Sequence, residues 1–194
     1  MRRLLAAVVA AAMLSACGAD SPRFQNADIT GASFGRDFVL TDAKGKTRRL
    51  ADFRGKAVVL FFGYTQCPDV CPAAMATLAE AMRQLGPLSH AVQGIFITLD
   101  PERDTPELLS RYVPAFHPSF IGLHGNAAQT EAVAKEFKVV FRKVPGATAE
   151  TYTVDHSAGM FVFDPEGRLR LFVSHGQSAD ALARDLRELL RMLE

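Results

Sequence analysis

The sequence is poor in cysteine and has no excess of charge of either sign. It has only three cysteines among 194 residues, and its 22 basic and 21 acidic residues nearly balance. With 48% hydrophobic and 22% charged residues, its composition is that of one globular domain with a single core. This composition excludes a disordered chain and collagen, and the lack of an internal repeat excludes a solenoid.

The sequence also lacks a hydrophobic run of membrane-spanning length. Its apolar start, Leu4 to Leu14, is too short to cross a bilayer comfortably. Positive residues precede this run and small residues follow it, which is the layout of a secretory signal. The letters LSAC, which end at Cys17, resemble the lipobox of bacterial lipoproteins, in which the cysteine is lipidated and becomes the mature N-terminus. We therefore expect a signal peptide over 1–16 and a lipid anchor at Cys17, on the periplasmic side of a bacterial membrane. A cleaved signal with an incidental Cys17 and an uncleaved anchor are the alternatives.

No excess of basic charge is present. Loss of residues 1–16 would remove two arginines and no acid, so 22 basic and 21 acidic residues become 20 and 21, a net charge of −1. No basic block remains to follow the phosphates of a nucleic acid, so a nucleic-acid partner is excluded. An exported chain lies outside the reducing cytosol. If Cys17 carries a lipid, the two remaining cysteines, Cys67 and Cys71, act together.

The order of expected elements indicates the fold class. Residues 17–33 are small, polar and turn-rich and read as a flexible tether, so the globular domain is expected over 34–194. Strands alternate with helices after a first hairpin, and this pattern predicts an α/β sandwich with a mixed central sheet flanked by helices. We expect an N-terminal hairpin near Phe38–Leu40 with a turn at Gly45, strands at 57–62, 94–99, 120–121 and 139–144, helices at 72–85, 105–116 and 127–137, a flexible insertion at 144–153, a hairpin of 159–163 with 169–173, and a last helix capped by Ser178 or Asp180.

Residues 63–72 (GYTQCPDVCP) hold the cysteine pair between the expected strand at 57–62 and its following helix. Pro72 suits the first turn of a helix, so both sulfurs are expected at the helix N-terminus, where the dipole lowers a thiol pKa. A structural disulfide is disfavoured, because a loop this short contributes only about 2 kcal/mol. Dithiol exchange and metal binding both remain open: the usual redox spacing is Cys-x-x-Cys, whereas two thiolates with a third soft ligand suit Cu(I) or Zn.

A third ligand has to come from the five histidines. Four of them, His90, His117, His124 and His175, lie at turns or element ends and are expected at the surface. His156 differs, because it precedes the expected strand at 159–163. If that strand lies beside 57–62 in the sheet, His156 arrives next to the cysteines. Asp155 is then either a cap at the start of the strand or a partner that fixes the imidazole tautomer.

Three motifs together resemble the SCO/SenC family of copper-binding proteins, which serve cytochrome c oxidase assembly. They are Gly63-Tyr64-Thr65 with Cys67-Pro68-Asp69-Val70-Cys71-Pro72, then Asp100 to Pro106, and finally Asp155-His156-Ser157. The resemblance implies a thioredoxin-like fold with Ser157-Ala158 at the usual cis-proline position. It also implies that Cys67, Cys71 and His156 bind Cu(I), with a further oxygen or nitrogen donor for Cu(II). Asp69 and Asp155 take supporting roles at most.

Two functions follow from this resemblance. The first is a metallochaperone, which accepts copper from a periplasmic donor and delivers it to the binuclear copper centre of a cytochrome c oxidase subunit. The second is an enzyme, a thiol-disulfide oxidoreductase that uses Cys67 and Cys71 to reduce the metal-ligand cysteines of that subunit; only the first requires His156. A thiol peroxidase is disfavoured because Thr65 lies two residues, not three, before Cys67. In the motif at 100–106, Asp100 and Asp104 either bind a partner or cap the helix at Thr105.

Overall fold

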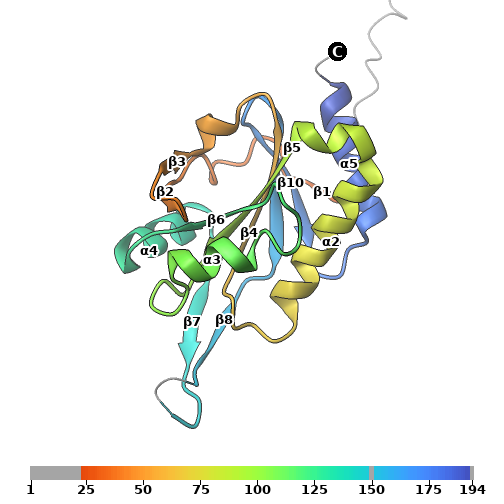
Figure 1. Cartoon of the computed structure of the whole chain (residues 1–194). Helices are drawn as coiled ribbons and strands as arrows, with labels where there is room; N and C mark the ends of the chain where they lie inside the picture. Colours follow the sequence, from red (N-terminus) through yellow and green to blue (C-terminus); the bar gives the residue numbers. More distant parts are fainter. Residues whose placement is uncertain (1–22, 149–150, 193–194) are drawn as a thin grey trace, which may run out of the picture.

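The computed structural model describes residues 23–148 and 151–192, so the expected signal peptide and Cys17 lie outside the described residues. Eight strands form one mixed sheet in the order β1-β10-β9-β4-β5-β6-β2-β3. Figure 1 shows helices on both sides of this sheet, as the alternating pattern predicted. The strands are β1 (Ala27–Asp28), β2 (Val39–Asp42), β3 (Thr47–Arg49), β4 (Ala57–Gly63), β5 (Val92–Thr98), β6 (Ile121–His124), β9 (Gly159–Phe163) and β10 (Leu169–Ser174).

The sheet is mixed because β4, β5 and β6 run parallel, whereas β9 runs antiparallel to β4. Every residue of β4 and of β5 is buried, since helices cover both faces. On one face, glycines of β5 and β6 bring the sheet close to α2 (Val70–Leu85) and α3 (Pro106–Tyr112), where an added Cβ would lie 3.1 Å from Leu78 or from Leu109. On the other face, Phe137 follows α4 (Ala127–Glu136) and contacts Phe62, with ring centroids 5.3 Å apart.

Most predicted elements are confirmed within a few residues. The first hairpin consists of β2 and β3, and the second pairs β9 with β10. The last helix, α5 (Ala179–Arg191), begins after Ser178, whose side chain accepts a hydrogen bond from Ala181 N, so Ser178 rather than Asp180 is the cap. Two short 3-10 helices, η1 (Leu50–Phe53) and η2 (Gly86–Ala91), complete the fold. No helix in the described part of the chain is long and apolar enough to span a bilayer.

The second half of the expected tether is not free in the structure but is attached to the domain. Strand β1 pairs antiparallel with β10 at the edge of the sheet. Just before it, Asn26 is buried, and the Asp185 carboxylate accepts hydrogen bonds from its backbone and side-chain nitrogens at 2.9 and 2.8 Å. The prediction of a free tether up to residue 33 is therefore wrong for these residues, because a buried carboxylate on α5 holds the polar segment against the domain.

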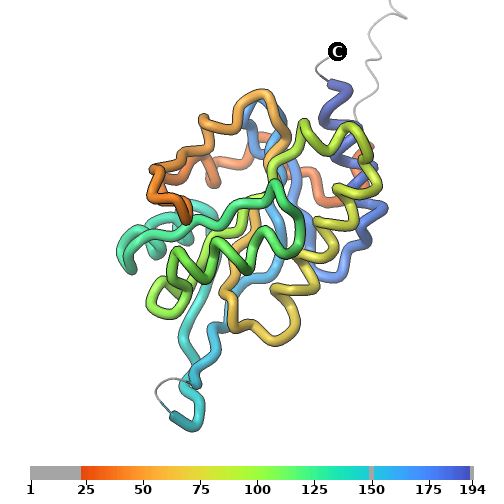
Figure 2. The backbone as a smooth tube through the Cα atoms, in the orientation of Figure 1, coloured from red at the N-terminus to blue at the C-terminus, as the bar shows by residue number. Residues whose placement is uncertain are grey.

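A second difference lies between α4 and β9. The expected strand at 139–144 is shorter, as β7 (Phe141–Val144), and it pairs with an unexpected strand, β8 (Thr153–His156). These two strands form a separate two-stranded sheet, called here the β7–β8 ribbon, which projects from the body of the molecule in Figures 1 and 2. The expected flexible insertion, 144–153, overlaps the end of β7 and the start of β8, and its flexibility stays a prediction. His156 ends β8 at the base of the ribbon.

Candidate metal centre

Strand β4 and helix α2 place the two cysteines. After the buried strand ends at Gly63, the chain turns and α2 begins at Val70, two residues earlier than predicted. Cys67 is half-buried in this turn, where its N–H donates to the Tyr64 carbonyl at 3.3 Å. Cys71 lies in the first turn of α2, is fully buried, and donates its N–H to the Cys67 sulfur at 3.4 Å. Both are free thiols, and they lie at the N-terminus of α2, as predicted.

Gly63 gives the Cys71 thiol its space. A Cβ added to Gly63 would lie 2.8 Å from the Cys71 sulfur and 2.8 Å from the Phe61 ring. Contacts that short do not occur between real atoms, and the neighbours here are packed core groups. A residue with any side chain at this position would therefore displace the thiol or the ring beside it.

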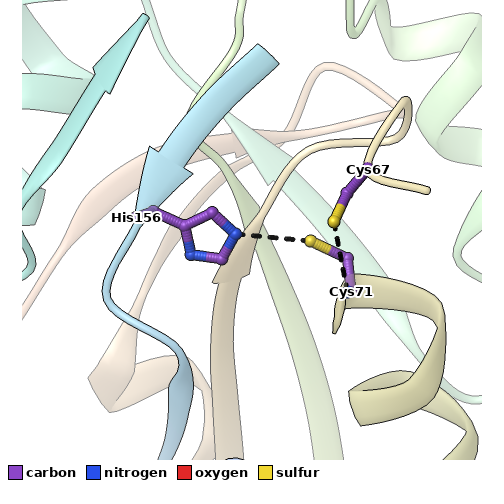
Figure 3. Close-up of side chains that lie close together, drawn as sticks. All are labelled: Cys67, Cys71 and His156. Carbon is purple, nitrogen blue, oxygen red and sulfur yellow. Dashed lines mark hydrogen bonds between the residues drawn. The ribbon is translucent and has the colours of Figure 1, made fainter. Parts of the chain in front are cut away.

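His156 reaches the cysteines from the other side of the turn. Its Nε2 lies 3.5 Å from the Cys71 sulfur, and Figure 3 shows the ring directed at the two sulfurs. Its Nδ1 lies 3.0 Å from the Ser157 carbonyl oxygen. A carbonyl only accepts hydrogen bonds, so Nδ1 carries the proton and Nε2 presents a lone pair toward the sulfurs. The rings of Phe61 and Tyr64 each lie 6.2 Å from the imidazole, edge-on, and wall the site on its inner side.

The sheet register explains why His156 arrives here. Strand β9 pairs with β4, with Met160 opposite Phe61, which is the pairing that would bring His156 to the cysteines. The residues just before β9 therefore lie beside the end of β4, where the cysteine turn begins. The peptide bonds at Ser157-Ala158 are trans, since the described residues contain no cis peptide.

The ligand atoms of Cys67, Cys71 and His156 all lie within 4.8 Å of one another. Donors bound at about 2.0–2.3 Å to one ion in a trigonal arrangement would be roughly 3.5–4 Å apart, so small side-chain rotations suffice. Two sulfurs with one imidazole nitrogen form a soft donor set, which suits Cu(I) or Zn²⁺ rather than Ca²⁺ or Mg²⁺. Among the residues that the structure describes, this is the sole such group of three.

The thiol chemistry of Cys71 departs from the sequence expectation. Burial raises the pKa of the Cys71 thiol well above its ordinary value, and the hydrogen bond with the Tyr64 backbone offsets only part of this rise. The prediction that this pKa would be lowered is therefore wrong for Cys71, because burial removes water from the sulfur and disfavours the thiolate. In the metal-free protein Cys71 is a thiol that can donate to the His156 Nε2.

The other histidines do not join the site, as expected. The His90 ring contacts the Pro87 carbonyl at the surface, and the His117 Nδ1 lies 2.8 Å from the Ser119 hydroxyl. His124 ends β6 and His175 is exposed after β10. None of them belongs to the group of possible metal ligands.

Two carboxylates were considered for supporting roles, and the structure tests that of Asp155. Asp155 lies within β8, is exposed, and pairs across the β7–β8 ribbon with Arg142 at 3.2 Å. It therefore does not cap the start of the strand. It does not hold the imidazole either, because the His156 Nδ1 donates to the Ser157 carbonyl. Asp69 occupies the N-cap of α2 without a side-chain capping bond.

The motif at 100–106 has a role that sequence reasoning missed. Asp104 is buried and accepts hydrogen bonds from the backbone N of Thr65 at 3.0 Å, from the Thr65 hydroxyl at 2.5 Å and from the Thr98 hydroxyl at 2.6 Å. Asp104 therefore fixes the turn two residues before Cys67. The side chain of Thr105 caps α3, so the expectation that Asp100 and Asp104 cap this helix is wrong: their carboxylates bind Thr65, Thr98, Arg103 and Tyr152 instead. The motif itself was visible in the sequence, but nothing local indicated which loop it would contact.

Comparisons with known proteins agree with this geometry. The SCO1/SenC family model matches residues 26–191. The mitochondrial SCO2 homologues of Bos taurus and Homo sapiens are 40% and 38% identical to the chain over 153 residues, which cover 78% of this chain and 58% of each relative. The chain thus spans somewhat more than half the length of these curated relatives.

Solved structures are similar over most of the chain. The structure of Bradyrhizobium japonicum ScoI with copper bound is 36% identical, with a TM-score of 0.74, and covers 81% of this chain and 99% of its own. The solution structure of apo Sco1 from Thermus thermophilus is 39% identical, with a TM-score of 0.78, and covers 88% and 99%. These similarities confirm the predicted thioredoxin-like sandwich.

Proposed function

The chain belongs to the SCO1/SenC family, and from this premise we propose that it is a copper metallochaperone. Its cargo is Cu(I), held by Cys67, Cys71 and His156, and its recipient is the binuclear copper centre of a cytochrome c oxidase subunit. The observation that carries this proposal is the convergence of two thiols and one imidazole nitrogen within 4.8 Å. A relative 36% identical to the chain has been solved with copper bound.

The three ligands have unequal access to solvent, and this inequality suits a protein that gives its cargo away. Cys71 is fully buried, whereas Cys67 and His156 are half-buried at the mouth of the site. A thiolate of the recipient can approach from the side of Cys67 and replace one ligand at a time. Binding of Cu(I) displaces the proton of the Cys71 thiol, whose neutral form burial favours in the metal-free protein.

A second candidate is the thiol-disulfide oxidoreductase. It is favoured by the contact in which the Cys71 N–H donates to the Cys67 sulfur at 3.4 Å, because both free thiols share one turn. In that reaction the two thiols lose two electrons and two protons to a disulfide of the oxidase subunit, which becomes a dithiol, while Cys67 and Cys71 form a disulfide. His156 has no necessary part in this step.

A transfer assay separates the two candidates. Copper-loaded protein is mixed without oxygen with the soluble copper domain of an oxidase subunit, once in its metal-free dithiol form and once in its disulfide form. The chaperone predicts movement of copper to the dithiol form, with loss of transfer in His156→Ala. Reduction of the disulfide form by metal-free protein, equal in wild type and His156→Ala, together with no copper transfer, would favour the reductase and contradict the chaperone.

We also propose that the mature chain begins at Cys17, carries lipid there, and works on the periplasmic side of a bacterial membrane. The signal-like start and the LSAC letters support this, and both lie outside the described residues. The test is the mass of the protein isolated from membranes, compared with a Cys17→Ser variant. A lipid-sized mass increase that the variant loses is expected, and an unmodified Cys17 in membrane-bound protein would contradict the assignment.

A further inference from the structure

The β7–β8 ribbon carries His156 but forms no part of the main sheet. Figures 1 and 2 show it extending away from the body, so its angle to the body depends on the contacts that attach it there. A small rotation of the ribbon would move the imidazole relative to the sulfurs. Whatever fixes the ribbon therefore also fixes the distance of 3.5 Å between the His156 Nε2 and the Cys71 sulfur.

Arg103, in the loop between β5 and α3, attaches the ribbon at the end of β8 that lies away from His156. One guanidinium nitrogen donates to the backbone carbonyl of Tyr152, the residue before β8, at 2.9 Å. The guanidinium carbon lies 3.5 Å from the centroid of the Tyr152 ring, so the two planar groups stack. The Arg103 side chain is only 14% exposed, so these contacts are largely shielded from water.

Asp100 fixes both partners of this stack. Its carboxylate is fully buried and accepts from the Arg103 Nε at 2.5 Å and from the Tyr152 hydroxyl at 2.6 Å. Asp100, Arg103 and Tyr152 therefore form a closed set of contacts, called here the ribbon clamp. An exposed ion pair between Lys143 on β7 and Glu102, at 2.6 Å, adds a second and weaker attachment between the same two segments.

The ribbon clamp also reaches the cysteine turn. The same guanidinium nitrogen that contacts Tyr152 lies 3.2 Å from the side-chain oxygen of Gln66, the residue before Cys67. Asp104, one residue after Arg103, holds Thr65 in that turn. The loop between β5 and α3 thus contacts both the segment that bears the cysteines and the segment that bears the histidine. No residue of this loop belongs to the group of possible metal ligands.

We propose that Arg103 is the positioning residue of this metal centre: the ribbon clamp holds the β7–β8 ribbon so that His156 completes the ligand set. The inference rests on the proposed copper site and adds a specific cause for the geometry of its third ligand. Loss of the Arg103 side chain removes one contact with the exposed Gln66 but leaves Asp104 holding the cysteine turn, and it frees the ribbon, so the imidazole spends less time beside the sulfurs. The consequence is weaker Cu(I) binding that acts through His156 and not through the fold.

The experiment is a double-mutant cycle on the full chain, with Cu(I) affinity measured without oxygen by competition with a chromophoric chelator. The variants are Arg103→Gln, His156→Ala, and the two combined. Arg142→Gln is the matched control, because Arg142 lies on the same ribbon, 77% exposed, in an ion pair with Asp155. Removal of a residue that orients a metal ligand typically lowers affinity about 10- to 100-fold, and we expect Arg103→Gln to fall in that range. The combined variant is expected to equal His156→Ala alone, and Arg142→Gln to equal wild type.

A second readout does not depend on copper. Hydrogen exchange of the backbone amides of β7 and β8 in the metal-free protein is expected to be faster in Arg103→Gln and unchanged in Arg142→Gln. Tyr152→Phe, which removes one hydrogen bond of the clamp and keeps the ring, gives a milder form of the same change if Arg103→Gln does not fold. Unchanged exchange, or a loss of affinity that adds in full to that of His156→Ala, would overturn the proposal. Equal copper affinity of wild type and His156→Ala with faster exchange in Arg103→Gln would instead overturn the proposed ligand set and leave the clamp standing.

Discussion

The Nε2 of His156 lies 3.5 Å from the Cys71 sulfur, although 85 positions of sequence separate the two residues. The pairing of β9 with β4 brings them together, because it returns the chain to the end of the strand that leads into the cysteine turn. The tautomer is set by the Ser157 carbonyl, which accepts from Nδ1 at 3.0 Å. The site is therefore built from one turn, one strand end and one backbone hydrogen bond, and each can be altered separately.

Gly63→Ala is expected to weaken both copper binding and the fold. The new Cβ would meet the Cys71 sulfur and the Phe61 ring at 2.8 Å, and overpacking of this kind costs about 1–3 kcal/mol. Urea unfolding and Cu(I) titration measure the two effects. Gly94→Ala is the matched control, since its Cβ would meet the Phe120 ring at 2.5 Å, away from the ligands. It should lose stability and keep copper affinity; wild-type affinity in Gly63→Ala would show that the thiol does not need this space.

Asp185→Ala is expected to release the N-terminal segment. The carboxylate accepts hydrogen bonds from Gln25 N at 2.7 Å and from both nitrogens of Asn26, and loss of charged hydrogen bonds costs about 1.5–3 kcal/mol each. Limited proteolysis should then cut within residues 23–33 faster than in wild type. Arg184→Gln, exposed on the same helix, is the control. Equal cleavage in Asp185→Ala and the control would mean that β1 alone holds the segment.

Stability is expected to fall in acid through Asp164. Burial raises the pKa of this carboxyl, but hydrogen bonds from the Arg168 backbone and from the Arg168 and Arg170 side chains outweigh it, so the pKa lies below the ordinary 3.8. A lowered pKa in the folded state gives stability that is present above pH 3.8 and is lost as the pH falls toward the folded pKa. Urea unfolding between pH 5 and pH 2.5 should show a shallower loss in Asp164→Asn than in wild type. Parallel curves would assign the acid sensitivity to other carboxylates.

The elements predicted from the sequence are those with strong local signals. A few consecutive residues are enough to identify the apolar run of β4, the cysteine turn and the β9–β10 hairpin. Strand β8 was missed because it is only four residues long, is largely polar and pairs only with β7. The attachment of Asn26 was missed because its partner, Asp185, lies 159 residues away.

In the candidate site, too, the residues with a local sequence signal were predicted and the contacts between distant residues were not. Motifs identified the cysteines and His156, and sheet pairing then explained their meeting. The contacts of Asp104 with Thr65 and of Arg103 with Tyr152 span 39 and 49 residues, and no periodicity marks such pairs. The raised pKa of Cys71 was also out of reach, because it depends on how completely the folded core excludes water from the sulfur.

In the proposed copper site, one imidazole completes the ligand set begun by two thiols. The most direct measurement is an anaerobic Cu(I) titration of wild type, His156→Ala and His175→Ala, with competition by a chelator to give affinities. One tightly bound ion per chain is expected in wild type and in the exposed-histidine control His175→Ala, whereas the Cu(I) affinity of His156→Ala is expected to be lower by about 10-fold or more. Affinity in His156→Ala equal to that of wild type would contradict the proposed ligand set.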